Sequence, residues 1–327
     1  MGSVASETLP IATVDISGYL ASDVEATARI VSQLGQAAQA HGILYITGHG
    51  ISSQLTEQLF DRAAAFFASP KETKQSVDIR NSRAMRGYET IGDQRLYNGK
   101  IDCKEGFMFA REGPEDSTRF LEGPNQWPRE DEVPRFKDIM LESYAEMQRV
   151  CLAVSRLLAL SLGLEEKFFD GLVAAPGSTT LMRAHRYPPA KPESGLGRNA
   201  LGAHTDFGGV TLLLQDSVGG LEFFDHASER WHTVPPVEDA LIMNLGDLIE
   251  RWTNARYKSA RHRVTSPDGD VYRFSVVFFS MGELDTVVEC LPGCVEAGER
   301  CRYEPVRIED HLKQRFRASY DAGVYQG

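Results

Sequence analysis

The chain has 327 residues, of which 42% are hydrophobic and 25% charged, and its formal net charge is −11. This composition is that of an ordinary globular protein, long enough to bury a large core as one elaborated domain or as two. Because Lys and Arg are not clustered, we expect neither a nucleic-acid partner nor an anionic membrane partner. No apolar run approaches the length that is needed to span a bilayer.

Cysteine usage and the N-terminal sequence favour a cytoplasmic protein. The five cysteines are odd in number and fit neither a disulfide framework nor the spacing of a zinc site. The first eight residues lack the basic and apolar regions of a secretory signal. We therefore expect reduced thiols and a cytoplasmic location.

Residues 1–112 are expected to form an N-terminal cap that is mainly helical. The apolar spacing predicts short strands and two helices, over 11–16 (strand), 23–40 (helix), 42–51 (strand ending in glycines), 53–68 (helix) and 104–110 (strand). Residues 71–103 are polar and poorly periodic, which predicts loops. His49 lies between two glycines at a strand end, where a structural hydrogen-bonding role is expected.

Residues 113–178 are expected to form a connector and one long supporting helix. Pro, Glu and Asp are frequent over 113–133, which is typical of an exposed segment. Between Pro134 and Leu162, large apolar residues recur at steps of three and four, among them Phe136, Met140 and Tyr144. This stripe predicts a helix that packs under a sheet.

Residues 179–327 change to short strands separated by Gly, Pro, Asp and Asn. The predicted strands are 179–187, 200–206, 210–215, 221–224, 240–244, 262–265, 271–279 and 286–289. One short helix near Leu248 and a final helix over 308–320 complete the region. The pattern indicates an α+β protein whose core is a double-stranded β-helix (jelly roll) with flanking helices.

His204 and Asp206 lie two residues apart in a segment that reads as a strand. Alternation along a strand would point both side chains to one face, where they could supply two ligands to a metal ion. With eight histidines and 46 acidic residues, about one His-x-Asp/Glu is expected by chance, so the pair alone is weak. His226 and His232 lie in turn-like sequence and are expected on the surface.

Further polar residues follow on the predicted β-region. His262 begins one strand and Arg273 another, and alternation places Ser275 on the same face as Arg273. Tyr187 ends an upstream strand. The order along the chain is His-x-Asp, then His, then Arg-x-Ser.

Together these motifs resemble the iron(II)- and 2-oxoglutarate-dependent oxygenases, in the isopenicillin N synthase-like branch. The stretch from Gly42 to Ile51 looks like the cap domain of that branch. Asn244–Asp247 and Tyr257–Val264 look like its catalytic domain. The resemblance covers most of the chain, and residues 202–263 look most like thymine 7-hydroxylase and related small-molecule oxygenases.

By this resemblance, the iron ligands are His204, Asp206 and His262. Two imidazoles and one carboxylate on one face of a six-coordinate ion leave three positions open, which suits non-haem Fe(II) oxygenases. A catalytic zinc hydrolase would need a neighbouring general base, and none is evident beside His204. The family uses 2-oxoglutarate and dioxygen as cosubstrates and releases succinate and CO2.

The resemblance also implies how 2-oxoglutarate is held. Arg273 can give a bidentate fork to its distal carboxylate, Ser275 a second donor, and Tyr187 matches a family tyrosine that often completes the site. Many relatives have Asn two residues before the Tyr-Pro sequence, whereas this chain has His185. His185 could contact the cosubstrate or fill a polar core position.

The substrate pocket is expected to combine cap residues with strands near the metal. Large apolar residues in strands are core by default, so either role is open for each candidate. The candidates are Tyr88, Phe107, Phe109, Leu212, Phe223, Phe279 and Met281. Residues 194–199 contain two glycines and could form either a flap or a surface turn.

The function expected from these features is oxidation, by default hydroxylation, of a small organic molecule such as a secondary metabolite. One alternative is an iron-dependent oxidase of the same fold that closes a ring or desaturates without 2-oxoglutarate. A second alternative is a non-catalytic jelly-roll binding protein. The identity of the substrate, the reaction outcome and the oligomeric state stay open at this point.

Overall fold

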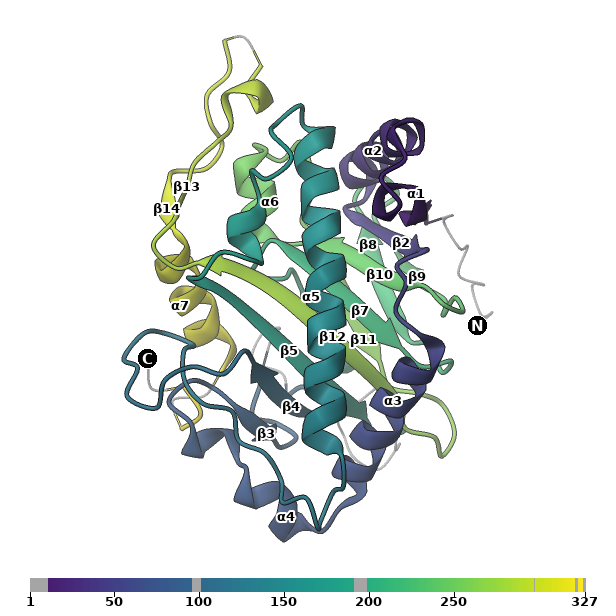
Figure 1. Ribbon diagram of the computed structural model, residues 1–327, viewed down its shortest axis with the longest axis vertical. Helices are drawn as coiled ribbons and strands as arrows, with labels where there is room; N and C mark the ends of the chain where they lie inside the picture. Colours follow the sequence, from purple (N-terminus) through teal and green to yellow (C-terminus); the bar gives the residue numbers. More distant parts are fainter. Residues whose placement is uncertain (1–10, 96–100, 191–198, 297, 321–322, 326–327) are drawn as a thin grey trace.

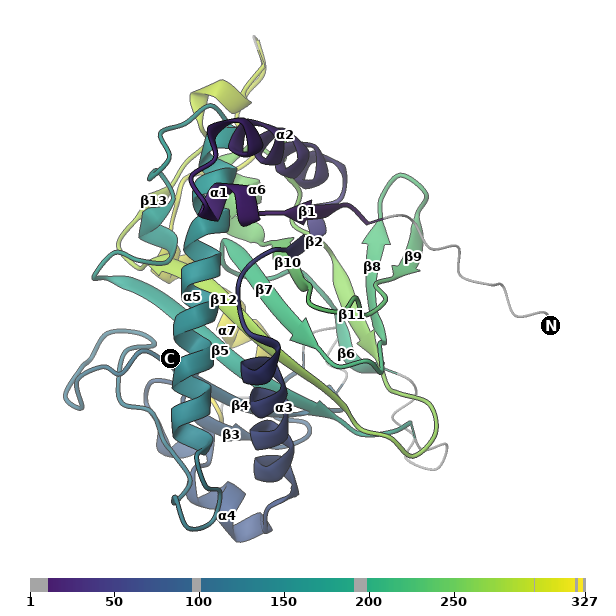
Figure 2. The same cartoon turned by 45° about the vertical axis from the view of Figure 1, so that its right-hand side comes forward.

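The structure is a computed structural model that describes residues 11–95, 101–190, 199–296, 298–320 and 323–325. Its centre is an eight-stranded sheet that faces a second sheet of four strands; a two-stranded ribbon lies apart from both. The long helix α5 crosses one face of the large sheet, and the small sheet lies on the other side (Figure 1 and Figure 2). The protein is thus layered as helices, large sheet and small sheet.

The N-terminal segment begins with β1 (Thr13–Asp15), α1 (Ser17–Leu20), α2 (Val24–Ala40), β2 (Ile43–Thr47) and α3 (Ser53–Ala68). Asp23 caps α2 by accepting a hydrogen bond from the Ala26 amide, and Ser52 caps α3 by accepting one from Leu55. The two helices predicted from apolar spacing are confirmed. β1 and β2 lie at one edge of the large sheet, where β2 pairs with β10.

The prediction of loops over 71–103 is wrong in part. The segment contains α4 (Lys71–Ser76), the 3-10 turn η1 (Ile79–Asn81) and β3 (Gly87–Glu89). Each is too short to show a periodic pattern, and tertiary contacts stabilise it instead. β3 pairs with β4 (Glu105–Ala110), which extends the large sheet at its other edge.

The predicted supporting helix is α5 (Phe136–Ser161), and η2 (Asp170–Leu172) follows it. Its apolar stripe is buried against the large sheet, as expected. Phe136 stacks on Phe66 of α3 at a centroid distance of 4.9 Å and meets Phe107 of β4 at 5.0 Å. These rings join α3, α5 and β4 into one aromatic layer.

The C-terminal half forms the jelly roll, so the predicted fold class is confirmed. Its strands and helices are β5 (Ser178–Tyr187), β6 (Asn199–His204), β7 (Val210–Gln215), β8 (Leu221–Asp225), β9 (Arg230–Thr233), β10 (Leu241–Leu245), α6 (Asp247–Trp252), β11 (His262–Thr265), β12 (Arg273–Glu283), β13 (Val287–Val288), η4 (Pro292–Cys294), β14 (Val306–Arg307) and α7 (Ile308–Ser319). The large sheet runs in the order β1-β2-β10-β7-β12-β5-β4-β3, and the small sheet in the order β6-β11-β8-β9. A separate apolar cluster, including Leu201, Leu213 and Val277, draws its residues from both sheets.

Within the described ranges, no helix is both long and apolar enough to cross a membrane.

We expect Phe66→Ala to lower the free energy of unfolding by about 3–5 kcal/mol, because it leaves a cavity in the aromatic layer. Phe66 is fully buried and lies within 6.0 Å of the rings of Phe67, Tyr88, Phe107 and Phe136. Denaturant unfolding measures the change. Phe168→Ala is the control, because Phe168 is 45% exposed and should cost far less; equal losses in the two variants would contradict the expected packing.

Candidate active site: a His-Asp-His cluster beside a buried arginine

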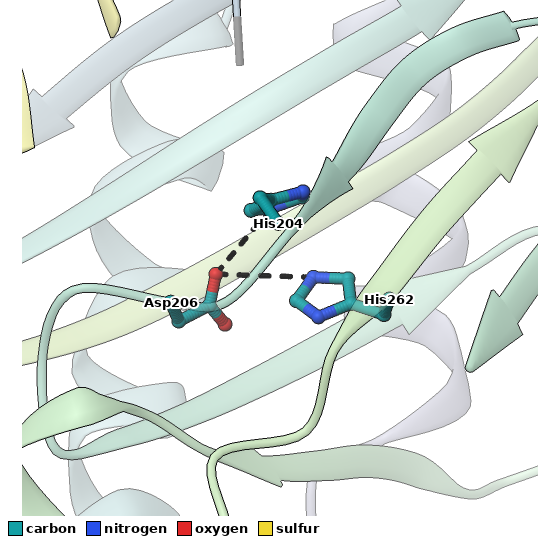
Figure 3. Close-up of side chains that lie close together, drawn as sticks. All are labelled: His204, Asp206 and His262. Atoms are coloured by element: carbon teal, nitrogen blue, oxygen red, sulfur yellow. Dashed lines mark ion pairs between the residues drawn. The ribbon is translucent and has the colours of Figure 1, made fainter. Parts of the chain in front are cut away.

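The pairing of β6 with β11 brings two histidines together. His204 is the cross-strand partner of His262, and their ring centroids are 4.3 Å apart. Oδ1 of Asp206 lies 3.7 Å from Nε2 of His204 and 3.8 Å from Nε2 of His262 (Figure 3). One atom from each side chain can therefore reach a common point, as the ligands of one metal ion must.

Asp206 reaches this cluster from a turn, and the prediction of a strand through residue 206 is wrong. β6 ends at His204, and the chain then turns at Gly208 and Gly209, which pack directly against the backbone of Ser280. The Gly209 amide donates to Ser280 O at 2.8 Å, and the carbonyl of Asp206 accepts from the Asp247 amide at 2.8 Å. These backbone bonds, rather than strand alternation, aim the carboxylate at the histidines.

Both histidines have a fixed tautomer. Nδ1 of His204 lies 2.8 Å from Gly202 O, and Nδ1 of His262 lies 2.9 Å from Ala260 O. A carbonyl only accepts, so each Nδ1 carries a proton and each Nε2 presents its lone pair to the cluster. Burial and the neighbouring His262 lower the pKa of His204 to about 3, which keeps this imidazole neutral.

The carboxylate of Asp206 is oriented by two hydrogen bonds to its other oxygen. Oδ2 accepts from Thr211 Oγ1 and from Asn244 Nδ2, both at 2.6 Å, which leaves Oδ1 directed to the histidines. Burial acts to raise the pKa of Asp206, but the two imidazoles and these hydrogen bonds outweigh it and lower the pKa. Thr211 and Asn244 are themselves cross-strand partners on β7 and β10.

A second polar cluster lies where β12 pairs with β5. Arg273 is the cross-strand partner of Tyr187, and its guanidinium carbon lies 4.9 Å from the centre of the tyrosine ring. Arg273 is fully buried; its Nη2 donates to Gln215 Oε1 at 3.0 Å. Within the described part of the chain, Nε and Nη1 of Arg273 and Oγ of Ser275 have no hydrogen-bond partner. Unpaired buried donors are costly, so this cluster fits an anionic ligand.

His185 lies beside this cluster, opposite Ser275 in the strand register. Its Nδ1 is 3.2 Å from the Tyr187 hydroxyl, while Nε2 is buried and has no hydrogen-bond partner among the described residues. Burial, followed by the nearby cations Lys104 and Arg183, lowers its pKa well below the usual value. The imidazole is therefore neutral.

One cavity runs from Tyr187 and His185 to the His-Asp-His cluster, while Arg273 and Ser275 lie behind its described lining. Aliphatic side chains of both sheets line it between Tyr187 and the histidines, namely Leu201, Leu213, Leu221, Val264 and Val277. Beyond the histidines it continues past Phe279 and Met281 to Phe207 and to Phe316 of α7. The arrangement provides an apolar passage next to the buried arginine and, past the histidines, a chamber lined by aromatic side chains.

The predicted substrate-pocket residues divide between this cavity and the helix side of the sheet. Phe279 and Met281 line the cavity, whereas the other five are absent from its described lining. On β4, Met108 faces the cavity, so alternation turns Phe107 and Phe109 towards α5, where they meet Phe136 and Tyr144. Tyr88 pairs with Phe107, Leu212 belongs to the same core, and Phe223 packs near His41.

The cavity has further lining residues that were not expected from the sequence. They are Gln94, Lys104, Met108, Leu181, Arg183, Phe207, Phe316 and Tyr320, with Thr211 and Asn244 beside Asp206. Arg183 left a signal: an arginine within the apolar run 179–184 shares a strand face with His185 and Tyr187. The flap proposed at 194–199 falls on residues 194–198, outside the described residues, and on the start of β6.

The remaining histidines divide as follows. His49 bonds to Asp239 O and accepts from the Ile51 amide, both at 3.1 Å, which confirms its structural role. His226 is exposed as predicted. The expectation for His232 is wrong because β9 was not anticipated. His232 lies on β9 opposite Phe223 and is buried against that ring.

Comparisons with known proteins match this geometry. A family model described as the non-haem dioxygenase in morphine synthesis N-terminal region matches residues 11–130, and one described as the 2OG-Fe(II) oxygenase superfamily matches residues 178–282. A 2-oxoglutarate-Fe(II) type oxidoreductase of Emericella nidulans, hxnY, is 38% identical over 94% of this chain and 89% of its own length. The chain belongs to the 2OG-Fe(II) oxygenase superfamily.

Other members of the superfamily are similar over almost their whole length. Clavatol oxidase claD of Penicillium crustosum is 36% identical over 94% of this chain and 96% of its own. Among solved structures, full-length thymine 7-hydroxylase of Neurospora crassa in complex with alpha-KG and thymine has a TM-score of 0.83 and 28% identity, covering 96% of this chain and 98% of that chain. A 2OG-Fe(II) oxygenase family protein from Caulobacter crescentus has a TM-score of 0.81 and 30% identity, over 95% and 99%.

The family resemblance inferred from the motifs is thus confirmed. The protein is an Fe(II)- and 2-oxoglutarate-dependent dioxygenase, with dioxygen as its second cosubstrate. The donor set fits the metal: two imidazoles that direct Nε2 to one point and one oriented carboxylate match the three-ligand site of non-haem iron oxygenases. The hypothesis of a non-catalytic binding protein is not supported.

We expect Thr211→Val to weaken Fe(II) binding about 10- to 100-fold, because Asp206 loses one of the two hydrogen bonds that orient it. Anaerobic Fe(II) titration measures the change. Thr180→Val is the matched control, since Thr180 is a buried threonine of the same sheet that bonds to Tyr144 on the helix side. Equal iron affinity in wild type and Thr211→Val would show that the hydrogen bond has no part in metal binding.

Proposed function

We propose that His204 and His262, each through Nε2, and Asp206, through Oδ1, hold the iron of this oxygenase. The proposal is supported by the spacing of the three atoms and by the two Nδ1 hydrogen bonds that direct both Nε2 lone pairs to one point. Bound there, Fe(II) would supply the open coordination positions at which 2-oxoglutarate and dioxygen react, with release of succinate and CO2. Thr211 and Asn244 keep the carboxylate in place.

The distal carboxylate of 2-oxoglutarate is assigned to Arg273 and Ser275, with Tyr187 flanking the arginine. The single observation that carries this assignment is the set of buried donors of Arg273 and Ser275 without partners among the described residues. A carboxylate satisfies them with charge-assisted hydrogen bonds. Leu213, Val264 and other aliphatic side chains of the passage would pack on the methylene groups and exclude water.

His185 is proposed to take the place of the asparagine found in many relatives. If Nδ1 accepts from the Tyr187 hydroxyl, Nε2 carries the proton and is a buried donor facing the cavity. A neutral imidazole can then donate to an oxygen of bound 2-oxoglutarate without adding charge. The lowered pKa of His185, caused mainly by burial, supports this neutral form.

The substrate is proposed to be a small secondary metabolite, which occupies the chamber beside Phe279 and Met281 and is hydroxylated by default. The similarity to clavatol oxidase supports this class, and the thymine-bound thymine 7-hydroxylase structure supports a small-molecule substrate more generally. We further propose a cytoplasmic enzyme without nucleic-acid or membrane partners. Residues 1–112 would act as the cap, 113–178 as the connector and supporting helix, and 179–327 as the catalytic jelly roll.

Anaerobic addition of 2-oxoglutarate to the Fe(II) protein tests the proposal. A visible metal-to-ligand charge-transfer band is expected, followed in air by succinate formation that a screen of small metabolites should stimulate. Absence of the band would favour an oxidase of the same fold that does not use 2-oxoglutarate. Asp206→Ala should abolish the band because it removes the anionic ligand.

We expect Arg273→Ala to cost about 2–5 kcal/mol in 2-oxoglutarate binding, because a buried carboxylate loses its charged partner. The dissociation constant should rise at least ~30-fold, as measured by anaerobic titration of the charge-transfer band. Arg263→Ala is the control, since Arg263 is on β11 and pairs with Glu222 outside the described cavity lining. An unchanged constant in Arg273→Ala would rule out this anchor.

His185→Phe and His185→Asn separate the two roles that are open for this residue. If Nε2 donates to 2-oxoglutarate, the phenyl variant should lose about 1–3 kcal/mol of cosubstrate binding, while the asparagine variant keeps a donor and most of the affinity. The same titration measures both variants. A loss of thermal stability without any change in 2-oxoglutarate affinity would instead assign His185 to the polar core.

A further inference from the structure

The chamber beyond the histidines has a cationic wall that is separate from Arg273. Arg183 of β5 and Lys104, which directly precedes β4, both line the cavity, together with Gln94 and Tyr320. The two cations are 6% and 3% exposed. Charged side chains are rarely buried to this extent unless they are paired or bind a ligand.

Arg183 lies too far along β5 to serve the arginine cluster. Tyr187, His185, Arg183 and Leu181 alternate onto the cavity face, and all four line the cavity. Arg183 is four residues from Tyr187, about 13 Å along the strand. Its cross-strand partner on β12 is Val277, one cavity-facing position before Phe279. Arg183 therefore lies where the aliphatic passage meets the end of the cavity beside Phe279, two cavity-facing positions beyond Tyr187.

The nearby carboxylate of Glu89 lies behind this wall. Its Oε1 accepts from the Tyr320 hydroxyl at 2.7 Å; its Oε2 contacts Arg183 and lies 3.7 Å from Lys104 Nζ. Glu89 fits there because Gly106 has no side chain: a Cβ at residue 106 would stand 2.6 Å from that Oε2. Asp102, also buried, accepts from the Gly202 amide.

The charge that faces the chamber is consequently positive. Arg183, Lys104 and Asp206 are the charged residues of the described cavity lining, and Asp206 belongs to the metal cluster. Arg183 donates through Nη1 to Gln94 Oε1 at 3.0 Å, while its Nε has no hydrogen-bond partner in the described ranges. Burial lowers the pKa of Lys104 because its ammonium group loses hydration. A bound anion would offset this loss of hydration free energy.

We propose that the substrate is a small organic acid whose carboxylate binds to Arg183 and Lys104. Its apolar body packs against Phe279, Met281 and Phe316, which places the oxidisable carbon between the cationic wall and the histidines. The inference rests on the proposed function, because it assigns the substrate end of the same cavity. Glu89 pairs with both cations from behind, and a substrate carboxylate would supply a second anion on the chamber side.

Calorimetry with matched acids and amides tests the proposal without turnover. The protein is loaded with Zn(II), which is not redox-active, and with saturating 2-oxoglutarate, so that Arg273 is already occupied. The probes are benzoate, phenylacetate and cinnamate, each against its primary amide. At least one acid should bind, at least tenfold more tightly than its amide.

Variants identify which side chains bind the carboxylate of the acid. Arg183→Gln and Lys104→Met should each weaken binding of the acid at least tenfold, with little change for the amide or for 2-oxoglutarate. The matched controls are Arg186→Gln and Lys74→Met, because both side chains pair with Glu105 on the opposite face of the same sheet. These controls should bind the acid as wild type does. The double variant Glu89→Gln/Arg183→Gln removes both charges together and serves if Arg183→Gln alone does not fold.

The outcomes distinguish failure of the organic-acid proposal from failure of the proposed 2-oxoglutarate-dependent function. Equal binding of acid and amide, full affinity in Lys104→Met and in the foldable Arg183 variant, or binding of no acid at all would overturn the organic-acid proposal. In each case 2-oxoglutarate binding leaves the proposed function standing. Failure of 2-oxoglutarate itself to bind overturns both. In air, the Fe(II) enzyme should form succinate faster with the acids than with the amides.

Discussion

The cross-strand pairing of β6 with β11 is the constraint on which the active site depends. It sets His204 opposite His262, and the carbonyls two residues before each histidine fix both tautomers. A slip of one residue in this register would turn one imidazole to the other face of the sheet. The metal site is thus specified largely by backbone hydrogen bonds, which hold rigid geometry better than long side chains would.

The large sheet performs two tasks on its two faces. Alternation along β4 and β5 turns Phe107 and Phe109 to α5 and leaves Met108, Arg183 and His185 facing the cavity. The aromatic layer on the helix side supports the strands that carry the polar residues. A polar wall buried inside a β-roll needs such support, because each unpaired group is held in place by packing as much as by hydrogen bonds.

Motifs predicted more of the site than periodicity did. The order His-x-Asp, His, Arg-x-Ser indicated the family and its fold. It combines a pair of metal ligands, a third ligand and a carboxylate-binding arginine in one β-region. Asp206 was placed on a strand because alternation explained its spacing equally well; the turn at Gly208 and Gly209 depends on tertiary contact with Ser280. β3 and β9 were missed because each is short and lies in polar sequence without an apolar run to mark it.

The substrate side was the least predictable part, again for a physical reason. Aromatic residues such as Phe107 and Tyr88 are equally suited to a pocket or to a core, and only the register of β3 with β4 decides the face. Gln94 lies in a segment without a readable period, and alternation along the predicted strand 104–110 places Lys104 on the face of Met108 without showing that this face lines a cavity. Phe316 and Tyr320 come from α7 and its C-terminal end, far away in the sequence.

That distance in sequence has a consequence for how such enzymes diversify. The His-Asp-His cluster is drawn from the middle of the jelly roll, whereas the other end of the cavity is lined by Gln94, Lys104, Phe316 and Tyr320. Amino-acid substitutions at these positions can change which substrates bind, while the His-Asp-His cluster stays unchanged. The same oxidative chemistry can in this way be directed to new metabolites by substitutions that lie far in sequence from the His-Asp-His cluster.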